Sequence, residues 1–305
     1  MSRLIQEHHQ SLSSYWVINR IGDEARMPRF FNETLPFSKV VPYRLTKRDV
    51  HFNDDVPLHY APSLEIVLYE NLSGNVVVDN QQMYIQNNSV VLNPPMTVHG
   101  GWVTSDSDGS CIYCLQVSLE HMAHYIQLEN FLAEKSLSLN NAPIIIPEYE
   151  QIHALMNDLF RCDDNVFLRN ISILSIFEII ARHIPSSDVY VDIKHKSMET
   201  LKTLISWTHH NFAKRVTLND AAAMVGYSKH YFCKWFKKQT NMSFVQYLKR
   251  VRVYNAGTLL LAGKSVSEAG YASGFENMSY FIKCFKEIRG CPPKQFVEAI
   301  RMYSN

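Results

Sequence analysis

Three residues in the N-terminal half carry side chains that commonly bind metal ions or polar small molecules. His59 precedes a β-type segment, Glu65 lies at the start of that segment, and His99 follows the run Asn93-Pro-Pro-Met96. Two imidazoles and one carboxylate can hold a metal ion, or can form hydrogen bonds with a small ligand. A purely structural role at the rim of a β-domain is the third alternative. We expect contact with a small effector, with no metal and no other cofactor.

The pair Cys111-x-x-Cys114 has the spacing of a redox motif or of half a zinc site. It lies in a strand-like run, where these two side chains would face opposite sides, and no second pair completes a zinc site. We therefore expect ordinary thiols in a reduced cytoplasm. Because the sequence also has no Gly-rich phosphate loop and no nucleophile elbow, we do not expect an enzyme.

The last third of the chain carries a different kind of chemistry, that of a basic surface. Residues 217–240 have the pattern of a helix, a tight turn and a second helix, with caps expected at Thr217 and Ser228 and a left-handed turn at Gly226. Phe232 and Phe236 are four residues apart, so they would face inward. The outward positions are polar or basic: Lys229, His230, Lys234, Lys237 and Lys238. This pattern predicts a helix-turn-helix with a basic recognition helix.

The same pattern recurs 48 to 49 residues later. Gly226-Tyr227 is matched by Gly274-Phe275, and Phe232-x3-Phe236 is matched by Phe281-x3-Phe285. We therefore predict two helix-turn-helix units, at about 217–240 and 265–289. Apolar residues at helical spacing in the segment 244–261 predict one helix that connects the units.

These residues resemble the AraC/XylS family of transcription regulators. The resemblance rests on Tyr247-Leu-Lys-Arg-Val-Arg252, Gly274-Phe275, Phe285-Lys286 and Gly290-x-Pro-Pro293, and it covers about a third of the chain. The family usually has Ile-Ala where this chain has Ala269-Gly270. That change removes a core side chain and adds a helix-interior glycine, which predicts a second unit of lower local stability (a softer unit) than the first.

The two recognition helices, 229–240 and 277–289, would enter successive major grooves about 34 Å apart. The resemblance places the base-reading positions at His230, Cys233, Lys234, Met278, Ser279, Ile282 and Lys283. Contacts to the DNA backbone are expected from Lys229, Lys237, Lys238, Lys249, Arg250, Arg252, Asn277 and Lys286. For each basic residue the alternative is a solvated side chain.

The charge is divided unequally along the chain. From Lys194 to the end there are 18 Lys and Arg against 6 Asp and Glu, which leaves 12 basic and 23 acidic residues before it. The C-terminal part therefore suits a polyanion and the N-terminal part repels one. The N-terminus lacks the apolar core of a signal peptide and no run is long enough to cross a bilayer, so we expect a cytoplasmic protein with no membrane partner.

The remaining sequence predicts an N-terminal β-domain. Short Val-, Ile- and Tyr-rich runs are separated by Asn, Asp, Gly and Pro, as in an antiparallel barrel; the expected strands are 40–51, 64–70, 75–79, 82–85, 89–92 and 110–117. The stretches His59–Glu65 and Asn88–His99 resemble the two cupin motifs, with Ala61 in place of one histidine. Metal-binding cupins use these positions as ligands, and AraC-type regulators commonly carry a cupin-like sensor.

The fold class expected is therefore α+β with two domains. An N-terminal arm (1–38) precedes a cupin-like barrel (39–118), a helical connector (119–184), a linker (185–197) and an all-α DNA-binding domain (198–305). The helix at 166–184 is more apolar than one buried stripe requires, which favours a homodimer through Phe167, Ile171 and Leu174 over packing within one chain.

These features together predict a sequence-specific transcriptional regulator of double-stranded DNA. We expect an activator that recruits RNA polymerase and responds to a small polar effector such as a sugar. The alternatives are a metal-dependent cupin enzyme localised to DNA, and a constitutive DNA binder without an effector. We expect His209 and His210 to be ordinary surface or helix residues.

Overall fold

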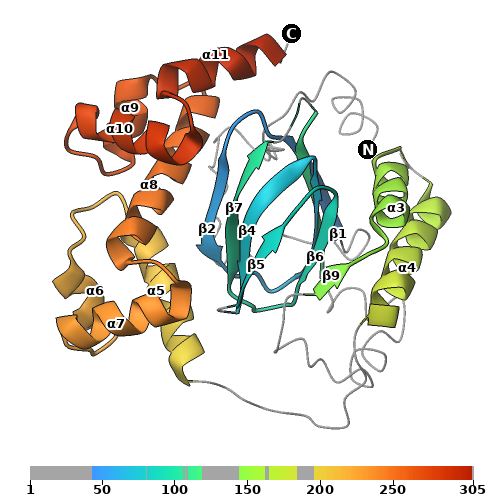
Figure 1. Ribbon diagram of the computed structural model, residues 1–305, viewed down its shortest axis with the longest axis horizontal. Helices are drawn as coiled ribbons and strands as arrows, with labels where there is room; N and C mark the ends of the chain where they lie inside the picture. Colours follow the sequence, from blue (N-terminus) through green and yellow to red (C-terminus); the bar gives the residue numbers. More distant parts are fainter. Residues whose placement is uncertain are drawn as a thin grey trace, which may run out of the picture.

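The computed structural model describes residues 43–303, apart from 80, 106, 108, 119–143, 162–164 and 184–195. The expected N-terminal arm (1–38) lies outside the described residues, as do most of the linker (185–197) and residues 119–143 of the connector. The described part has β-sheets in its N-terminal half and helices in its C-terminal half (Figure 1). The predicted α+β class with two domains is thereby confirmed.

Within the described residues, nine strands form two antiparallel sheets. The five-stranded sheet has the order β1-β8-β3-β6-β9, and the four-stranded sheet has the order β2-β7-β4-β5. The strands are β1 (Tyr43–Asp49), β2 (Asp54–His59), β3 (Leu64–Glu70), β4 (Leu72–Val78), β5 (Gln81–Ile85), β6 (Ser89–Asn93), β7 (His99–Ser105), β8 (Cys111–Val117) and β9 (Ile144–Ile146).

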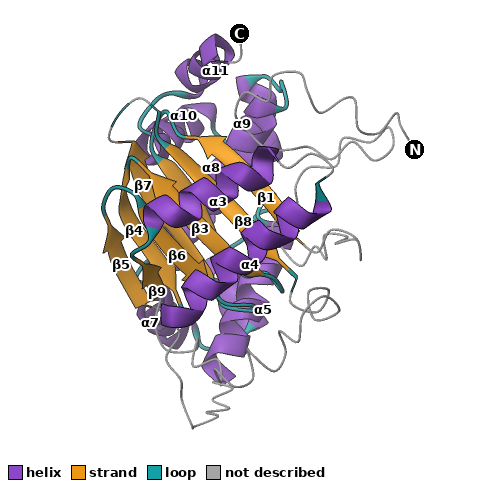
Figure 2. Ribbon diagram, turned by 90° about the vertical axis from the view of Figure 1, so that its right-hand side faces the viewer, coloured by secondary structure: helices purple, strands orange, loops and turns teal. Residues whose placement is uncertain are grey.

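The alternation of side chains along β3 shows how the layers are built. Ile66 and Leu68 pack into a cluster with two helices, whereas Val67 packs between the sheets with Val76 and Val103. Successive residues of a strand point to opposite faces, so an almost continuous apolar run serves two layers. The helices α3 (Tyr149–Arg161) and α4 (Val166–His183) lie across the outer face of the five-stranded sheet (Figure 2).

Strands β2 and β7 were not among the strands expected from the sequence. β2 contains two aspartates and Pro57, and β7 begins His99-Gly-Gly101, so neither has the usual composition of a strand. The glycines allow the neighbouring strands to come close. A Cβ atom at Gly100 would lie 2.8 Å from the carbonyl oxygen of Val56, and one at Gly101 would lie 2.7 Å from that of Asn75.

The helical domain packs on the outer side of the four-stranded sheet (Figure 1). It consists of α5 (Lys196–Asn211), α6 (Leu218–Met224), α7 (Lys229–Thr240), α8 (Phe244–Leu261), α9 (Val266–Ala272), α10 (Met278–Arg289) and α11 (Pro293–Tyr303). The predicted connecting helix at 244–261 is confirmed as α8.

Local sequence sets the ends of the two helix-turn-helix units. Thr217 and Asp220 form a capping box at α6, Ser228 accepts a hydrogen bond from the backbone of Tyr231 at α7, and Gly226 has a φ of 72°. These three predictions are confirmed. In the second unit, Ser265 caps α9 and Asn277 caps α10, so each helix begins where a side-chain oxygen satisfies a free N–H.

The helix-interior glycine of the second unit fills a tight position. A Cβ atom at Gly270 would lie 2.7 Å from Cε of Met278 and 2.8 Å from Cδ1 of Phe281. The space that a larger side chain would occupy is thus taken by residues of α10. Where the family usually has Ile-Ala, this chain has Ala269-Gly270, and side chains of the recognition helix α10 fill the space beside Gly270.

Candidate DNA-binding surface and sensor site

The two recognition helices α7 and α10 present their expected DNA-facing residues to solvent. Phe232 and Phe236 of α7 are fully buried, as are Phe281 and Phe285 of α10, so each helix has a fixed inner face. Of the seven positions expected to read bases, six are exposed and Met278 is half-buried: His230, Cys233, Lys234, Met278, Ser279, Ile282 and Lys283. Exposed apolar Ile282 beside Lys283 gives the second helix a surface that can contact a thymine methyl as well as a guanine.

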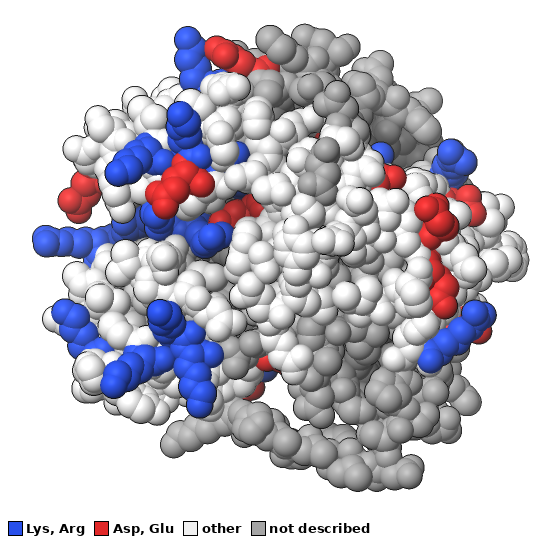
Figure 3. All heavy atoms as spheres, in the orientation of Figure 1, with Lys and Arg blue, Asp and Glu red and all other residues white. Residues whose placement is uncertain are grey.

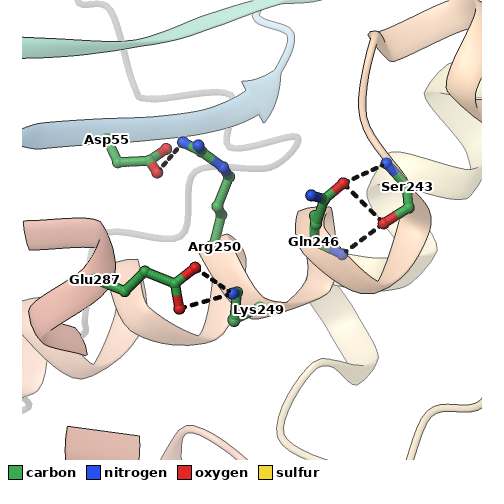
Figure 4. Close-up of polar contacts among 6 residues, drawn as sticks. All are labelled: Asp55, Ser243, Gln246, Lys249, Arg250 and Glu287. Carbon is green, nitrogen blue, oxygen red and sulfur yellow. Dashed lines mark hydrogen bonds and ion pairs between the residues drawn. The ribbon is translucent and has the colours of Figure 1, made fainter. Parts of the chain in front are cut away.

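The residues expected to contact the DNA backbone fall into two groups. Those on the recognition helices or their caps are exposed: Lys229, Lys237, Lys238, Asn277 and Lys286. Those on α8 make contacts within the protein. Lys249 lies 3.1 Å from Glu287 of α10, and Arg250 forms an ion pair with Asp55 of β2 (Figure 4). The guanidinium of Arg252 donates hydrogen bonds to the carbonyl oxygens of Phe212 and Lys214, both at 2.9 Å.

Basic side chains gather over the helical domain. On the face shown in Figure 3, Lys and Arg lie mainly over the part of the molecule formed by α5 to α11, while few acidic side chains lie among them. A positive surface of this kind attracts the phosphate backbone regardless of base sequence. In the part of the chain that the structure describes, no helix has the length and apolar character needed to cross a bilayer.

The structure brings His59, Glu65 and His99 together between the two sheets. Their ligand-type atoms all lie within 4.8 Å of one another, and all three residues are buried. Nε2 of His99 lies 2.9 Å from Oε2 of Glu65, and the rings of His59 and His99 are 4.3 Å apart between centroids. Glu65 also accepts a hydrogen bond at 2.7 Å from the amide of Gln116. Three residues from three different strands, β2, β3 and β7, thus form one polar cluster in an apolar interior.

Charge is unevenly distributed within this cluster. Burial opposes ionisation of Glu65, but the His99 imidazolium and its hydrogen bond lower the pKa of this carboxyl to about 2. Burial likewise disfavours a charged His99, yet the Glu65 carboxylate raises the pKa of His99. For His59, burial and the charge on His99 lower the pKa to about 4. The cluster at neutral pH is therefore an imidazolium–carboxylate pair beside a neutral imidazole.

Strand β2 joins this cluster to the helical domain. The carbonyl oxygen of Leu58, next to His59, accepts a hydrogen bond of 3.0 Å from the hydroxyl of Tyr247 in α8. Nε2 of His209 lies 2.7 Å from that hydroxyl and 3.3 Å from the Leu58 oxygen. His209 lies in helix α5, as expected, but it is a buried residue with partners in β2 and α8, and not a surface residue. Burial holds its pKa well below the usual range.

The other end of β2 carries two buried carboxylates. Asp54 forms ion pairs with Arg48 and with Arg289 of α10, while Asp55 pairs with Arg250 of α8. The guanidinium of Arg250 also lies 5.0 Å from the ring of Trp102. Sequence reasoning missed this role of β2, because Arg289 and Arg250 are 235 and 195 residues from their partners and no local pattern signals such a pair.

Helix α4 presents an apolar stripe to solvent. Phe167 is 82% exposed, Ile171 58% and Leu174 42%, and Leu168 beside them is also exposed. The opposite side of the helix, including Ile173, Ile176 and Phe177, is buried against α3 and the sheet. The helix is therefore apolar on two sides, and among the residues that the structure describes only one of these sides is covered.

Comparisons with known proteins agree with this geometry. A family profile described as a helix-turn-helix domain matches residues 221–299, the segment that contains both units. The uncharacterised HTH-type transcriptional regulator YdeC of Bacillus subtilis is 21% identical over 259 residues, which is 81% of this chain and 87% of YdeC. The regulator YobQ of the same organism is 30% identical over 105 residues, but the match spans only 44% of YobQ and 34% of this chain.

The fold is also found in a solved structure. ToxT from Vibrio cholerae superimposes with a TM-score of 0.50 at 15% identity, and the match covers 84% of this chain and 97% of ToxT. At this identity the likeness shows the two-domain fold alone. The helix-turn-helix profile and the relatives, by contrast, show that the chain belongs to the AraC/XylS family of transcriptional regulators.

Proposed function

We propose that this protein activates transcription by binding a specific duplex DNA site through both α7 and α10. The observation that carries the proposal is that the two recognition helices share one arrangement of side chains and that both expose their outer face to solvent. Each has a buried pair of phenylalanines on one side and a lysine at the same position on the other, Lys234 in α7 and Lys283 in α10. A lysine at a recognition-helix position can bond guanine O6 and N7 in the major groove.

Affinity for the backbone would come from the exposed group of Lys229, Lys237, Lys238, Asn277 and Lys286. For Lys249, Arg250 and Arg252 a phosphate contact would require their present contacts to be exchanged. DNA binding as a homodimer would place two copies on paired sites, and α4 supports this arrangement because Phe167, Ile171 and Leu174 are exposed. Such an activator works in the cytoplasm beside RNA polymerase.

The N-terminal domain would sense a small polar effector, such as a sugar, at or beside His59, Glu65 and His99. Support comes from the convergence of these three polar side chains inside an otherwise apolar sandwich. An effector can change DNA binding only by the difference in its affinity for two arrangements of the protein. Strand β2, which carries His59, contacts α5, α8 and α10 of the helical domain. A bound effector could therefore change how the two domains pack against each other through these contacts.

The test is selection of bound duplexes from a random pool, followed by affinity measurements with the selected site. The double substitution Lys234→Ala and Lys283→Ala should weaken binding to that site by about 1–3 kcal/mol per lysine and remove the preference over random DNA. The matched control, Lys264→Ala with Lys294→Ala, removes the same charge from exposed positions outside α7 and α10. Equal loss of preference in both double variants would refute recognition by α7 and α10.

A further inference from the structure

The two helix-turn-helix units share one fold but differ in charge. Residues 217–240 contain four lysines and one acidic residue, Asp220, whose carboxylate is used in the capping box of α6. Residues 265–289 contain three basic and three acidic residues: Glu268, Glu276, Lys283, Lys286, Glu287 and Arg289. Four positive charges against one give the first unit a balance of +3, whereas three against three give the second unit a balance of zero.

The difference arises at equivalent positions of the two recognition helices. An offset of 49 residues aligns α7 with α10, and two lysines recur under it, Lys234 as Lys283 and Lys237 as Lys286. The other two lysines of α7 have no basic counterpart. Lys229 corresponds to the half-buried Met278, and Lys238 corresponds to Glu287. All four lysines of α7 are exposed, so the additional charge of the first unit faces solvent.

Other cations near the second unit are engaged in contacts within the protein. Nζ of Lys249 in α8 lies 3.1 Å from Oε1 of Glu287 (Figure 4). Arg289 of α10 and Arg250 of α8 form ion pairs with the two buried aspartates at the start of β2. The N-terminal domain thus neutralises two guanidinium groups that would otherwise add to the positive field around α10.

The same contrast is visible on the molecular surface. In Figure 3, Lys and Arg gather at the lower left, over the part formed by α5 to α7, without acidic side chains among them. Over α9 to α11, at the upper left, acidic side chains lie beside the basic ones. The outer face of α10 also carries Ile282, which is 42% exposed and can contact a thymine methyl without any charge.

We propose that the first unit supplies most of the phosphate-dependent affinity for DNA, and that the second unit contributes mainly base recognition with little dependence on salt. The inference rests on the proposed function, because both α7 and α10 must reach the duplex. Each neutralised phosphate contributes about −0.9 to the slope of log affinity against log salt concentration, so the four lysines of α7 can contribute between −3 and −4, roughly. In the second unit, Glu276 and Glu287 repel phosphates and reduce the contribution of its lysines.

The unequal charge also sets the order of contacts during binding. Electrostatic attraction acts over about 8 Å in physiological salt, whereas base contacts require direct approach. The first unit therefore meets the duplex first. Helix α8 connects the two units, so α10 then reads the neighbouring groove.

The first measurement is the affinity of the purified protein for a random-sequence duplex over a range of salt concentrations. Two double variants each remove two positive charges, Lys229→Gln with Lys238→Gln from α7 and Lys283→Gln with Lys286→Gln from α10. We expect the α7 variant to reduce the salt slope by about 2 and to lower affinity about tenfold or more. The α10 variant should reduce the slope by less than about 1, because nearby carboxylates already weaken its attraction for phosphates.

A third double variant controls for total charge. Lys264→Gln with Lys294→Gln removes two exposed lysines outside both recognition helices and should leave the slope unchanged. Circular dichroism checks that every variant is folded. Equal reductions in slope for the α7 and α10 variants would overturn the unequal division of phosphate contacts.

The second measurement is the preference for the selected duplex over the random one. Ile282→Ala removes no charge, so it should lower the preference about threefold or more while the salt slope stays that of the wild-type protein. Ile145→Ala, at an exposed position of β9, is the matched control. An unchanged preference in Ile282→Ala would overturn the reading role of the second unit. A wild-type protein with unequal slopes on random DNA but no preferred duplex would instead overturn the proposed function and leave the division of charge standing.

Discussion

The hydroxyl of Tyr247 donates a hydrogen bond of 3.0 Å to the carbonyl oxygen of Leu58, which joins the central helix of the DNA-binding domain to the strand that carries His59. Both residues are buried, so neither group can exchange this bond for water. His59, and with it the cluster of His59, Glu65 and His99, is thus separated from the helix between the two helix-turn-helix units by one peptide group and one hydrogen bond.

Removing this bond should weaken the connection between the domains. We expect Tyr247→Phe to lower the free energy of unfolding by about 1–3 kcal/mol, because the buried Leu58 carbonyl and the His209 imidazole lose a partner. Calorimetry should show the two domains unfolding less cooperatively than in the wild-type protein. Tyr271→Phe removes the hydroxyl of an exposed tyrosine on α9 and is the matched control. A single unchanged transition in Tyr247→Phe would show that this contact does not couple the domains.

The interface should also respond to pH through Asp55. Burial raises the pKa of this carboxyl to about 6, although Arg250 opposes the shift. In the unfolded chain the group loses its proton near pH 4, so between about pH 4 and 6 only the folded state keeps it. Stability supplied by Asp55 is therefore present below pH 4 and is lost as the pH rises through 6.

Replacing Asp55 with asparagine should remove this part of the pH dependence. Relative to the wild-type protein, Asp55→Asn should gain on the order of 2–3 kcal/mol in unfolding free energy between pH 4 and pH 7. Urea unfolding at both pH values measures this, with Glu150→Gln in α3 as the exposed carboxylate control. Parallel pH curves for Asp55→Asn and the wild-type protein would contradict the assignment.

The two helix-interior glycines at positions 257 and 270 should respond to alanine in opposite directions. At Gly270 the new Cβ atom would meet Met278 and Phe281 below 3.0 Å, so overpacking of about 1–3 kcal/mol exceeds the helix gain of about 1 kcal/mol. At Gly257 the nearest atom is 3.4 Å away, on the guanidinium of Arg289, so the helix gain should prevail. Thermal unfolding of both variants measures the sign. Stabilisation by Gly270→Ala would show that α10 yields easily, as in a softer second unit.

The exposed stripe of α4 should control the oligomeric state. Ile171→Glu places a carboxylate among Phe167, Leu168 and Leu174, which an apolar dimer interface would not tolerate. We expect a dimer in the wild-type protein and a monomer in the variant, measured by analytical ultracentrifugation. Ala154→Glu, at an exposed position of α3, adds the same charge elsewhere and should remain dimeric. An Ile171→Glu protein with unchanged mass in solution would place the interface elsewhere.

The helix-turn-helix units could be predicted from the sequence almost to the residue. Their signals are local: Thr217 and Ser228 cap helices within three residues of themselves, Gly226 ends a helix by its own backbone conformation, and Phe232 faces Phe236 one turn away. Such interactions depend on neighbours in the chain and not on the rest of the fold. Repetition of the pattern in α9 and α10 strengthened the prediction.

Only the tertiary structure decided what β2 and β7 are and what they contact. Asp54, Pro57 and Gly101 are unfavourable in strands, and they form strands here because neighbouring strands supply hydrogen bonds and close packing. The same holds for Arg250, whose charge and position suit a phosphate until Asp55, 195 residues away, is placed beside it. The sequence by itself indicated the family, the two helix-turn-helix units and the polar residues His59, Glu65 and His99. The burial of His59, Glu65 and His99, the distances between them and their link to α8 depend on contacts between distant segments, which no local pattern encodes.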